Sequence, residues 1–364
     1  LAASVHGALE IQEHPNGICP TRLPAWTRAQ HADGGMERMS SQTSGVRIRL
    51  VTAAQNIHLE ATFTRTASST HPARPLRVVA ESPRAHHSIS VDEGDILVES
   101  PDRTAIRQRG ERSQLDFVLD SPNEERSVTL WLPHSAASNL HRLTADAPLR
   151  PAASERIRWL HYGSSISHGS DLDDPRSPWP QQVARKLQFD LVNLGFAGNA
   201  MLDPFVAGAI AAAPADFISL KIGINLVNGD AMRARTFVPA VHGFLDRVRA
   251  GHPTVPIAVI SALACPIHEH TTGPTRESSP GKAGATFREI RAGDGSLTLT
   301  RTRELLASTV EMRADPALHF VNGLDLLGTD DGHLPDNLHP DTDGHTMIAA
   351  RFAPIVRSLL HLTD

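Results

Sequence analysis

Apolar and polar positions follow one pattern before residue 150 and another after it. In the first part they alternate in short runs, such as the VRIRL of residues 46–50, so each run places one face of a strand in a core and the other in water. Clusters of Pro, Gly, Asp and Ser separate the runs. The predicted strands are residues 46–50, 57–63, 76–80, 89–91, 96–98, 115–119 and 128–132. This pattern is typical of an antiparallel β-sandwich or jelly roll.

After residue 150, strand-like apolar runs alternate with helical patterns. The predicted strands are residues 157–162, 190–194, 217–222 and 257–261, and the predicted helices are residues 180–188, 204–213, 237–249, 297–312 and 345–360. Such alternation predicts a parallel sheet with helices on both faces. We therefore expect a β-sandwich accessory domain over residues 1–150 and an α/β domain over residues 151–364.

Composition agrees with this plan and excludes several classes of protein. The 364 residues suffice for two hydrophobic cores, and 40% apolar with 21% charged residues indicates a globular chain. A net charge of −5 without a basic stripe argues against a nucleic-acid partner. No apolar run approaches the roughly 18 to 20 residues of a membrane span. The first residues lack the pattern of a signal peptide, so a cytoplasmic protein and a cleaved, secreted one both fit.

Three loops that follow predicted strands carry candidate catalytic groups, because ligands bind at the carboxyl ends of strands in such sheets. Ser165 lies in the GSSISHG segment after the first strand, where a tight turn can expose its Oγ and its N–H can stabilise an oxyanion. Gly198 follows the second strand and allows close backbone approach to a substrate. Asn225 follows the third strand and can either donate to an oxyanion or cap the next helix. Each feature alone is also common in ordinary loops.

The segment DNLHP near the end of the chain supplies a candidate base. Asp336 and His339 are three residues apart, so one turn can bring their side chains together. A carboxylate bonded to one imidazole nitrogen fixes the tautomer and leaves the other nitrogen to accept a serine proton.

These four motifs, in this order, resemble the SGNH hydrolases, also called the GDSL esterase/lipase family. That family carries a Ser in a GDSx turn, a Gly, an Asn in a GxN turn and a DxxH pair. Here those positions hold Ser165, Gly198, Asn225, Asp336 and His339. The resemblance covers about residues 156–360 and implies a flavodoxin-like three-layer α/β domain. The two-domain layout is similar to that of family members with an N-terminal β-sandwich.

Two positions depart from the family pattern. Ser164 stands where the GDSx motif has Asp, and Leu226 stands where an Asp often follows the GxN Asn. The Asp of the GDSx turn is not the nucleophile in the family, so the chemistry is expected to survive. Leu226 can alter local loop support or substrate preference and leaves the Asn in place.

The resemblance implies a serine carboxylic-ester hydrolase that needs no metal or organic cofactor. Ser165 would attack an ester carbonyl, His339 would accept its proton and Asp336 would orient the imidazole. The N–H groups of Ser165 and Gly198 and the side chain of Asn225 would form the oxyanion hole. We expect a short acyl group such as acetyl on a carbohydrate or another small molecule. An acyltransferase with the same residues and a non-catalytic binding protein are the alternatives.

Two further features remain open at this stage. Two cysteines, Cys19 and Cys265, are too few for a disulfide scaffold, and whether they pair is left open. Residues 265–294 are too long for an ordinary connector and either line the site or form a surface insertion. His268 and His270 in this segment are candidates for lining the substrate site, with a solvated loop as the alternative. They lack the further converging ligands that a metal site needs. The oligomeric state is not predicted.

Overall fold

The structure, a computed structural model, describes residues 1–68, 72–100, 105–120, 124–152, 156–286, 293–329 and 332–362. These residues form two compact units. One comprises Leu1–Arg156 with Asp173–Arg176, and the other comprises Ile157–Leu172 with Ser177–Asp364. The boundary expected between residues 150 and 151 stays a prediction. No described helix is both long and apolar enough to cross a membrane.

Two β-sheets make up most of the first unit. One sheet has the order β1-β4-β11-β6-β7, with β13 paired to β4, and the other has the order β2-β3-β12-β5-β8-β9, with β10 paired to β5. The strands of the first sheet are β1 Val5–His6, β4 Arg47–Thr52, β6 Leu76–Glu81, β7 His86–Val91, β11 Arg126–Trp131 and β13 Arg150–Pro151. Those of the second are β2 Glu10–His14, β3 Gly17–Thr21, β5 Asn56–Ser68, β8 Asp95–Glu99, β9 Ala105–Gln108, β10 Ser113–Val118 and β12 Ala136–Ala145. The short helices are η1 Ala2–Ser4, η2 Ala25–Gln30 and α1 Gly34–Ser41.

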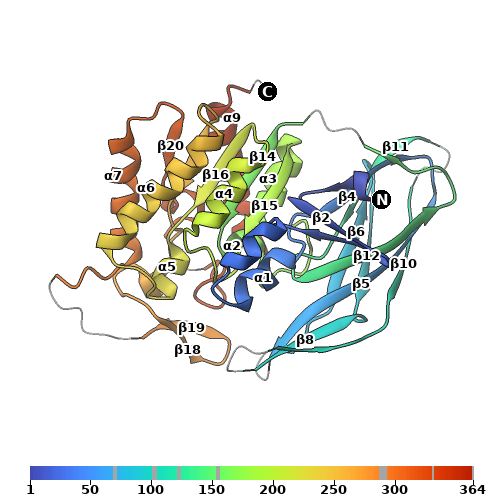
Figure 1. Cartoon of the computed structure of the whole chain (residues 1–364), viewed down its shortest axis with the longest axis horizontal. Helices are drawn as coiled ribbons and strands as arrows, with labels where there is room; N and C mark the ends of the chain where they lie inside the picture. Colours follow the sequence, from blue (N-terminus) through green and yellow to red (C-terminus); the bar gives the residue numbers. More distant parts are fainter. Residues whose placement is uncertain are drawn as a thin grey trace. The chain divides into compact units, whose positions relative to one another are not determined.

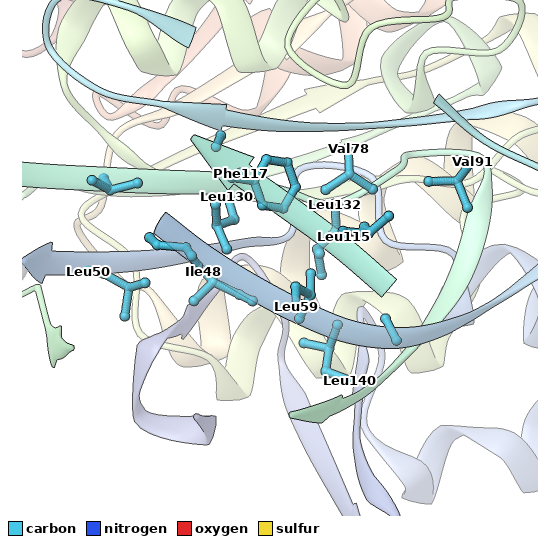
Figure 2. Close-up of a cluster of buried hydrophobic side chains, with 14 of the residues drawn as sticks. Ile48, Leu50, Leu59, Val78, Val91, Leu115, Phe117, Leu130, Leu132 and Leu140 are labelled. Atoms are coloured by element: carbon cyan, nitrogen blue, oxygen red, sulfur yellow. The ribbon is translucent and has the colours of Figure 1, made fainter. Parts of the chain in front are cut away.

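Alternating apolar residues of these strands form one hydrophobic core. Leu59 of β5 lies opposite Leu115 of β10 and Leu143 of β12, so the predicted alternation sets the register. Ile48, Leu59 and Phe117 are fully buried in the cluster that Figure 2 shows. Burial of each such side chain stabilises the fold by about 1.5–3 kcal/mol. The β-sandwich expected from the sequence is thus confirmed.

The polar side of β4 differs from the prediction. Alternation in residues 46–50 predicts that Arg47 and Arg49 face water, but both are 3% exposed. The Arg47 guanidinium lies 5.6 Å from the centre of the Trp131 ring and donates a hydrogen bond to the Gly45 carbonyl. A long arginine stem packs as an apolar group while its head is paired, so alternation alone does not place this face in water. The second sheet also contains one parallel pair, β5 with β8.

A five-stranded parallel sheet forms the centre of the second unit, drawn from green to red in Figure 1. Its order is β15-β14-β16-β17-β20, which in chain order reads 2-1-3-4-5 and is the flavodoxin-like order. The strands are β14 Arg158–Gly163, β15 Asp190–Gly195, β16 Phe217–Lys221, β17 Ile257–Ile260 and β20 Leu318–Val321. The order reverses between β14 and β16, where ligands bind in such sheets.

Helices cover both faces of this sheet. On one face, Trp159 of β14 contacts Trp179 of α3 and Phe352 of α9, with ring centres 6.2 and 6.1 Å away. On the other face, Tyr162 lies 5.1 Å from Phe244 of α6. The helices are α2 Ser165–His168, α3 Trp179–Leu187, α4 Pro204–Ala212, α5 Ile224–Asn228, α6 Ala234–Gly251, η3 Pro266–His268, α7 Leu299–Arg313, α8 Leu324–Leu327 and α9 Thr342–Leu359. This three-layer arrangement confirms the expected fold class.

The long segment after β17 contains structure that the sequence pattern does not predict. Strands β18 Thr275–Ser279 and β19 Lys282–Ala285 form an antiparallel hairpin. Residues 287–292, which fall in the same expected loop, lie outside the described residues. Neither Cys19 nor Cys265 forms a disulfide.

Candidate active site

The nucleophile candidate begins a short helix at the carboxyl end of β14. Ser165 is the first residue of α2, and its side chain is nearly buried. The turn into α2 requires a glycine before it, because a Cβ at Gly163 would lie 2.3 Å from the Ser167 Oγ. As the first helical residue, Ser165 has a backbone N–H without an intrahelical acceptor. That N–H is therefore available to bind an oxyanion.

A buried hydrogen-bond network holds this turn in place. His161, fully buried in β14, contacts the Ser167 Oγ through Nε2 at 2.7 Å and the Ser219 Oγ through Nδ1 at 2.7 Å. Burial, followed by the nearby Lys221 charge, lowers the pKa of His161 well below its ordinary value. The ring is therefore a neutral packing and hydrogen-bonding element.

The Asp336–His339 turn is tightly hydrogen-bonded. The Asp336 Oδ1 accepts from the backbone N–H groups of Leu338 at 2.9 Å and His339 at 2.6 Å, and Oδ2 lies 2.7 Å from the His339 Nδ1. Burial acts to raise the pKa of Asp336, but the hydrogen bonds from His339 and Leu338 together lower it to about 2. Asp336 is therefore ionised at neutral pH and can only accept, so Nδ1 carries the imidazole proton.

The structure brings this turn against the serine. The His339 Nε2 lies 2.8 Å from the Ser165 Oγ, although 174 residues separate the two along the chain. With the proton on Nδ1, Nε2 accepts from the serine hydroxyl. Asp336, His339 and Ser165 thus form one continuous hydrogen-bonded chain in the order that acyl transfer requires.

Two loops present the other candidate donors. Gly198 has a left-handed backbone with φ 72°, and a Cβ placed on it would meet no atom within 4 Å, so its position is open. Asn225 is the second residue of α5 and is 3% exposed. Its Oδ1 accepts from the backbone N–H of Ala200 at 3.2 Å, which orients the amide and leaves Nδ2 as its donor. Asn225 does not cap the helix, because the N-cap position is Gly223.

Hydrogen bonds join the nucleophile turn to the loop that carries Gly198. The side chain of Asn193 donates to the Ser167 carbonyl at 2.7 Å and accepts from the Gly195 N–H at 2.9 Å. The His168 Nδ1 donates to the Gly195 carbonyl at 3.0 Å. These hydrogen bonds hold the loops after β14 and β15 in one arrangement.

The β18–β19 hairpin contacts the Asp336–His339 turn directly. The Ala283 N–H donates to the Asp336 carbonyl at 2.8 Å, and the Asn337 Nδ2 donates to the Ala283 carbonyl at 3.0 Å. Lys282 donates to the Pro335 carbonyl. Part of the segment expected to line the site thus supports the turn that holds the candidate base.

The structure places the two histidines of this segment differently. His268 is fully buried, with Nδ1 3.1 Å from the Thr271 carbonyl and Nε2 2.7 Å from the Thr275 Oγ1. It therefore holds its own segment together and offers no exposed atom to a substrate. His270 is exposed. Glu269, between them, forms a bidentate ion pair with Arg303, so in the described structure this triplet does not converge on one point.

Sequence reasoning missed a charged group beside His339 and a buried charge at the end of β16. Asp171, six residues after Ser165, places its Oδ2 3.5 Å from the His339 Nδ1. Lys221 ends β16 and is 2% exposed, and its ammonium has no hydrogen-bond partner among the described residues. Burial lowers the pKa of Lys221 to about 8. Neither residue lies in a recognisable motif, so no sequence signal marks them.

Comparison with known proteins defines the class of this site. The model of the GDSL-like lipase/acylhydrolase family matches residues 161–347, just over half of the chain. The chain belongs to this family and is an enzyme of the carboxylic-ester hydrolase class. The resemblance stated from the motifs is thus confirmed. No curated protein matches the chain.

Solved structures share the fold over nearly the whole chain. A salicylyl-acyltransferase, SsfX3, from a tetracycline biosynthetic pathway has a TM-score of 0.80 at 24% identity, covering 98% of this chain and 95% of that one. A family two carbohydrate esterase from Clostridium thermocellum in complex with cellohexaose has a TM-score of 0.63 at 12% identity, covering 98% and 99%. An acetyl xylan esterase from Butyrivibrio proteoclasticus has a TM-score of 0.62 at 12% identity, covering 100% and 97%. These identities establish the shared fold only.

Proposed function

We propose that the protein hydrolyses short-acyl esters, with acetyl preferred, of a carbohydrate or another small molecule. The observation that carries the proposal is the hydrogen-bonded chain from Asp336 through His339 to the Ser165 Oγ, with contacts of 2.7 and 2.8 Å. Such an arrangement activates a serine for attack on a carbonyl carbon.

The reaction proceeds in two halves. His339 takes the proton from Ser165 as the Oγ attacks the ester carbonyl, and Asp336 stabilises the imidazolium. The negative oxygen is held by the N–H groups of Ser165 and Gly198 and the Nδ2 of Asn225. His339 then gives the proton to the departing alcohol, which leaves the acyl group on Ser165. His339 deprotonates a water as the water attacks the acyl-enzyme, and it returns this proton to the Ser165 Oγ as the bond to the acyl group breaks and the acid leaves.

Substrate class is inferred from the kind of fold. Two of the solved structures with this two-unit fold are described as a carbohydrate esterase and an acetyl xylan esterase, which supports an acetylated carbohydrate as the first substrate to test. The second candidate is acyl transfer to an alcohol, which the description of SsfX3 as an acyltransferase favours. Both reactions share the acyl-enzyme and differ only in whether water or an alcohol accepts the acyl group.

One experiment tests the proposal and separates the two candidates. The enzyme is given p-nitrophenyl acetate, butyrate and octanoate, and acetylated xylan, with and without an added alcohol acceptor. We expect free acetate as the main product and falling kcat/KM from acetate to octanoate. An acylated alcohol that exceeds free acid would instead establish the acyltransferase. Highest activity on octanoate would contradict the short-acyl preference.

A further inference from the structure

We propose that Asp171 is a second positioning carboxylate for His339, one that sustains part of the activity when Asp336 is removed. This inference rests on the proposed function, because it assigns a role within the same serine chemistry. It adds a fourth residue to the chain formed by Asp336, His339 and Ser165.

Two carboxylates approach the same nitrogen of the imidazole. The His339 Nδ1 lies 2.7 Å from the Asp336 Oδ2 and 3.5 Å from the Asp171 Oδ2. One oxygen of each carboxylate and one ring nitrogen all lie within 4.8 Å of one another. Nδ1 has one proton, so Asp336 takes the short hydrogen bond and Asp171 contributes charge at slightly longer range.

The position of Asp171 in the chain explains how this contact can orient the His339 ring. Asp171 follows the end of α2 by three residues and so belongs to the same loop as the nucleophile. That loop therefore contacts the ring at both nitrogens, through the Ser165 Oγ at Nε2 and through the Asp171 carboxylate at Nδ1. Because one loop reaches both nitrogens, Asp171 can hold the ring facing Ser165 independently of the Asp336 turn.

The backbone conformation at Asp171 restricts which residues fit there. Its φ is 68°, in the left-handed region that is unfavourable for most residues other than glycine. Asp and Asn tolerate this conformation better than other side chains do. Asp171 is thus a residue that this conformation accepts, and its carboxylate lies beside the His339 ring.

Because the two carboxylates differ in exposure, removing each should lower kcat to a different extent. The charged side chains that the described residues place against the His339 ring are Asp336 and Asp171. Asp171 is 51% exposed, whereas Asp336 is 28% exposed and also holds two backbone N–H groups. Solvent screens the more exposed charge, so Asp171→Asn alone should lower kcat by no more than about fivefold.

Loss of Asp336 reveals the second carboxylate. In a serine hydrolase that has one carboxylate on its histidine, the Asp→Asn change lowers kcat by about 10⁴. Here the Asp171 oxygen needs to approach the ring by only about 0.7 Å to reach ordinary hydrogen-bond distance. We therefore expect Asp336→Asn to lower kcat by about 10²-fold and the double variant by about 10⁴-fold, a loss larger than the product of the single losses.

The test compares Asp171→Asn, Asp336→Asn and the double variant, with Asp173→Asn as a matched control. Asp173 is also an exposed aspartate, two residues further on, and no contact with the ring is described for it. Two rates are measured for each, hydrolysis of p-nitrophenyl acetate and covalent labelling of Ser165 by a serine-reactive phosphonate. Circular dichroism and thermal unfolding establish that each variant is folded.

A pH profile separates positioning from a structural role. Removing the Asp171 charge makes the protonated imidazole less favourable, so the acid limb of the Asp171→Asn profile should shift to lower pH. Asp173→Asn should leave it in place, and Asp171→Glu should restore the wild-type limb. A merely structural role would lower the rate without moving the limb.

The outcomes are distinguishable from failure of the proposed function. If wild type and Ser165→Ala are equally inactive in both assays, the serine chemistry itself is refuted. If Ser165 reacts, but the double variant equals Asp336→Asn and the acid limb does not move, the role of Asp171 alone is overturned.

Discussion

Replacement of Asn225 tests the oxyanion hole quantitatively. The side chain is 3% exposed, and its Oδ1 accepts the Ala200 N–H at 3.2 Å. Its Nδ2 is the group that we assign to the oxyanion. Loss of one such donor costs about 100- to 1000-fold in kcat, or about 2.7–4 kcal/mol of transition-state stabilisation. Because the donor acts on charge that develops only in the transition state, KM should change little.

Two substitutions separate the proposed catalytic role of Asn225 from its structural one. Asn225→Ala removes both functions and leaves the Ala200 N–H without its acceptor, which should also lower the free energy of unfolding by about 1–3 kcal/mol. Asn225→Asp has nearly the same shape and keeps that acceptor. It loses the Nδ2 donor and places a negative charge beside the developing oxyanion. We therefore expect Asn225→Asp to be at least as inactive as Asn225→Ala, although it keeps the acceptor for the Ala200 N–H.

The measurement is steady-state hydrolysis of p-nitrophenyl acetate together with urea unfolding of each variant. Asn228→Ala is the control, because Asn228 lies in the same helix and its Oδ1 has no hydrogen-bond partner among the described residues. It should leave kcat near the wild-type value. The assignment would be refuted if Asn225→Asp kept kcat within threefold of wild type, or if the loss appeared in KM alone.

Two further predictions concern pH and charge. The pKa of Asp336 is about 2 in the folded protein, below the ordinary 3.8, which corresponds to about 2 kcal/mol of stability present above pH 4 and lost as the pH falls toward 2. The difference in unfolding free energy between wild type and Asp336→Asn should therefore shrink over that window in urea titrations, and a constant difference would refute it. Burial lowers the pKa of Lys221 to about 8 from 10.5, so below pH 8 the buried charge destabilises the folded wild type in full. This destabilisation is lost as the pH rises from 8 to 10.5. Lys221→Met should stabilise the protein at pH 7 by up to about 3 kcal/mol and lose that advantage near pH 10.5, whereas a less stable variant at pH 7 would show that the ammonium is compensated.

The sequence predicts those elements whose stability comes from a regular apolar pattern. The runs at residues 57–63 and 217–222 correspond to β5 and β16, because each buries a repeating face. Strand β20 was missed because its four residues carry too short an apolar run to separate it from a loop. The β18–β19 hairpin was missed because its residues are largely polar and exposed, and backbone bonds to the Asp336 turn help to hold it.

The candidate site also contains residues that the sequence predicts and residues that it does not. Ser165, Asn225 and the Asp336/His339 pair lie in short motifs with a defined order, so residue types and spacing are enough to select them. Asp171 lies in a loop rich in aspartate, and its proximity to His339 depends on one left-handed residue and on a contact between segments far apart in the chain. His268 illustrates the converse, because a histidine that looked accessible in the sequence is buried by bonds within its own segment.

Covalent labelling of the serine nucleophile tests the central claim most directly. The wild type and Ser165→Ala are treated with a serine-reactive phosphonate, the adduct is located by peptide mass spectrometry, and turnover of p-nitrophenyl acetate is measured in parallel. We predict one adduct, on Ser165, with turnover lost in proportion to labelling and neither adduct nor turnover in Ser165→Ala. An adduct on another residue, or turnover in Ser165→Ala close to that of the wild type, would contradict the account.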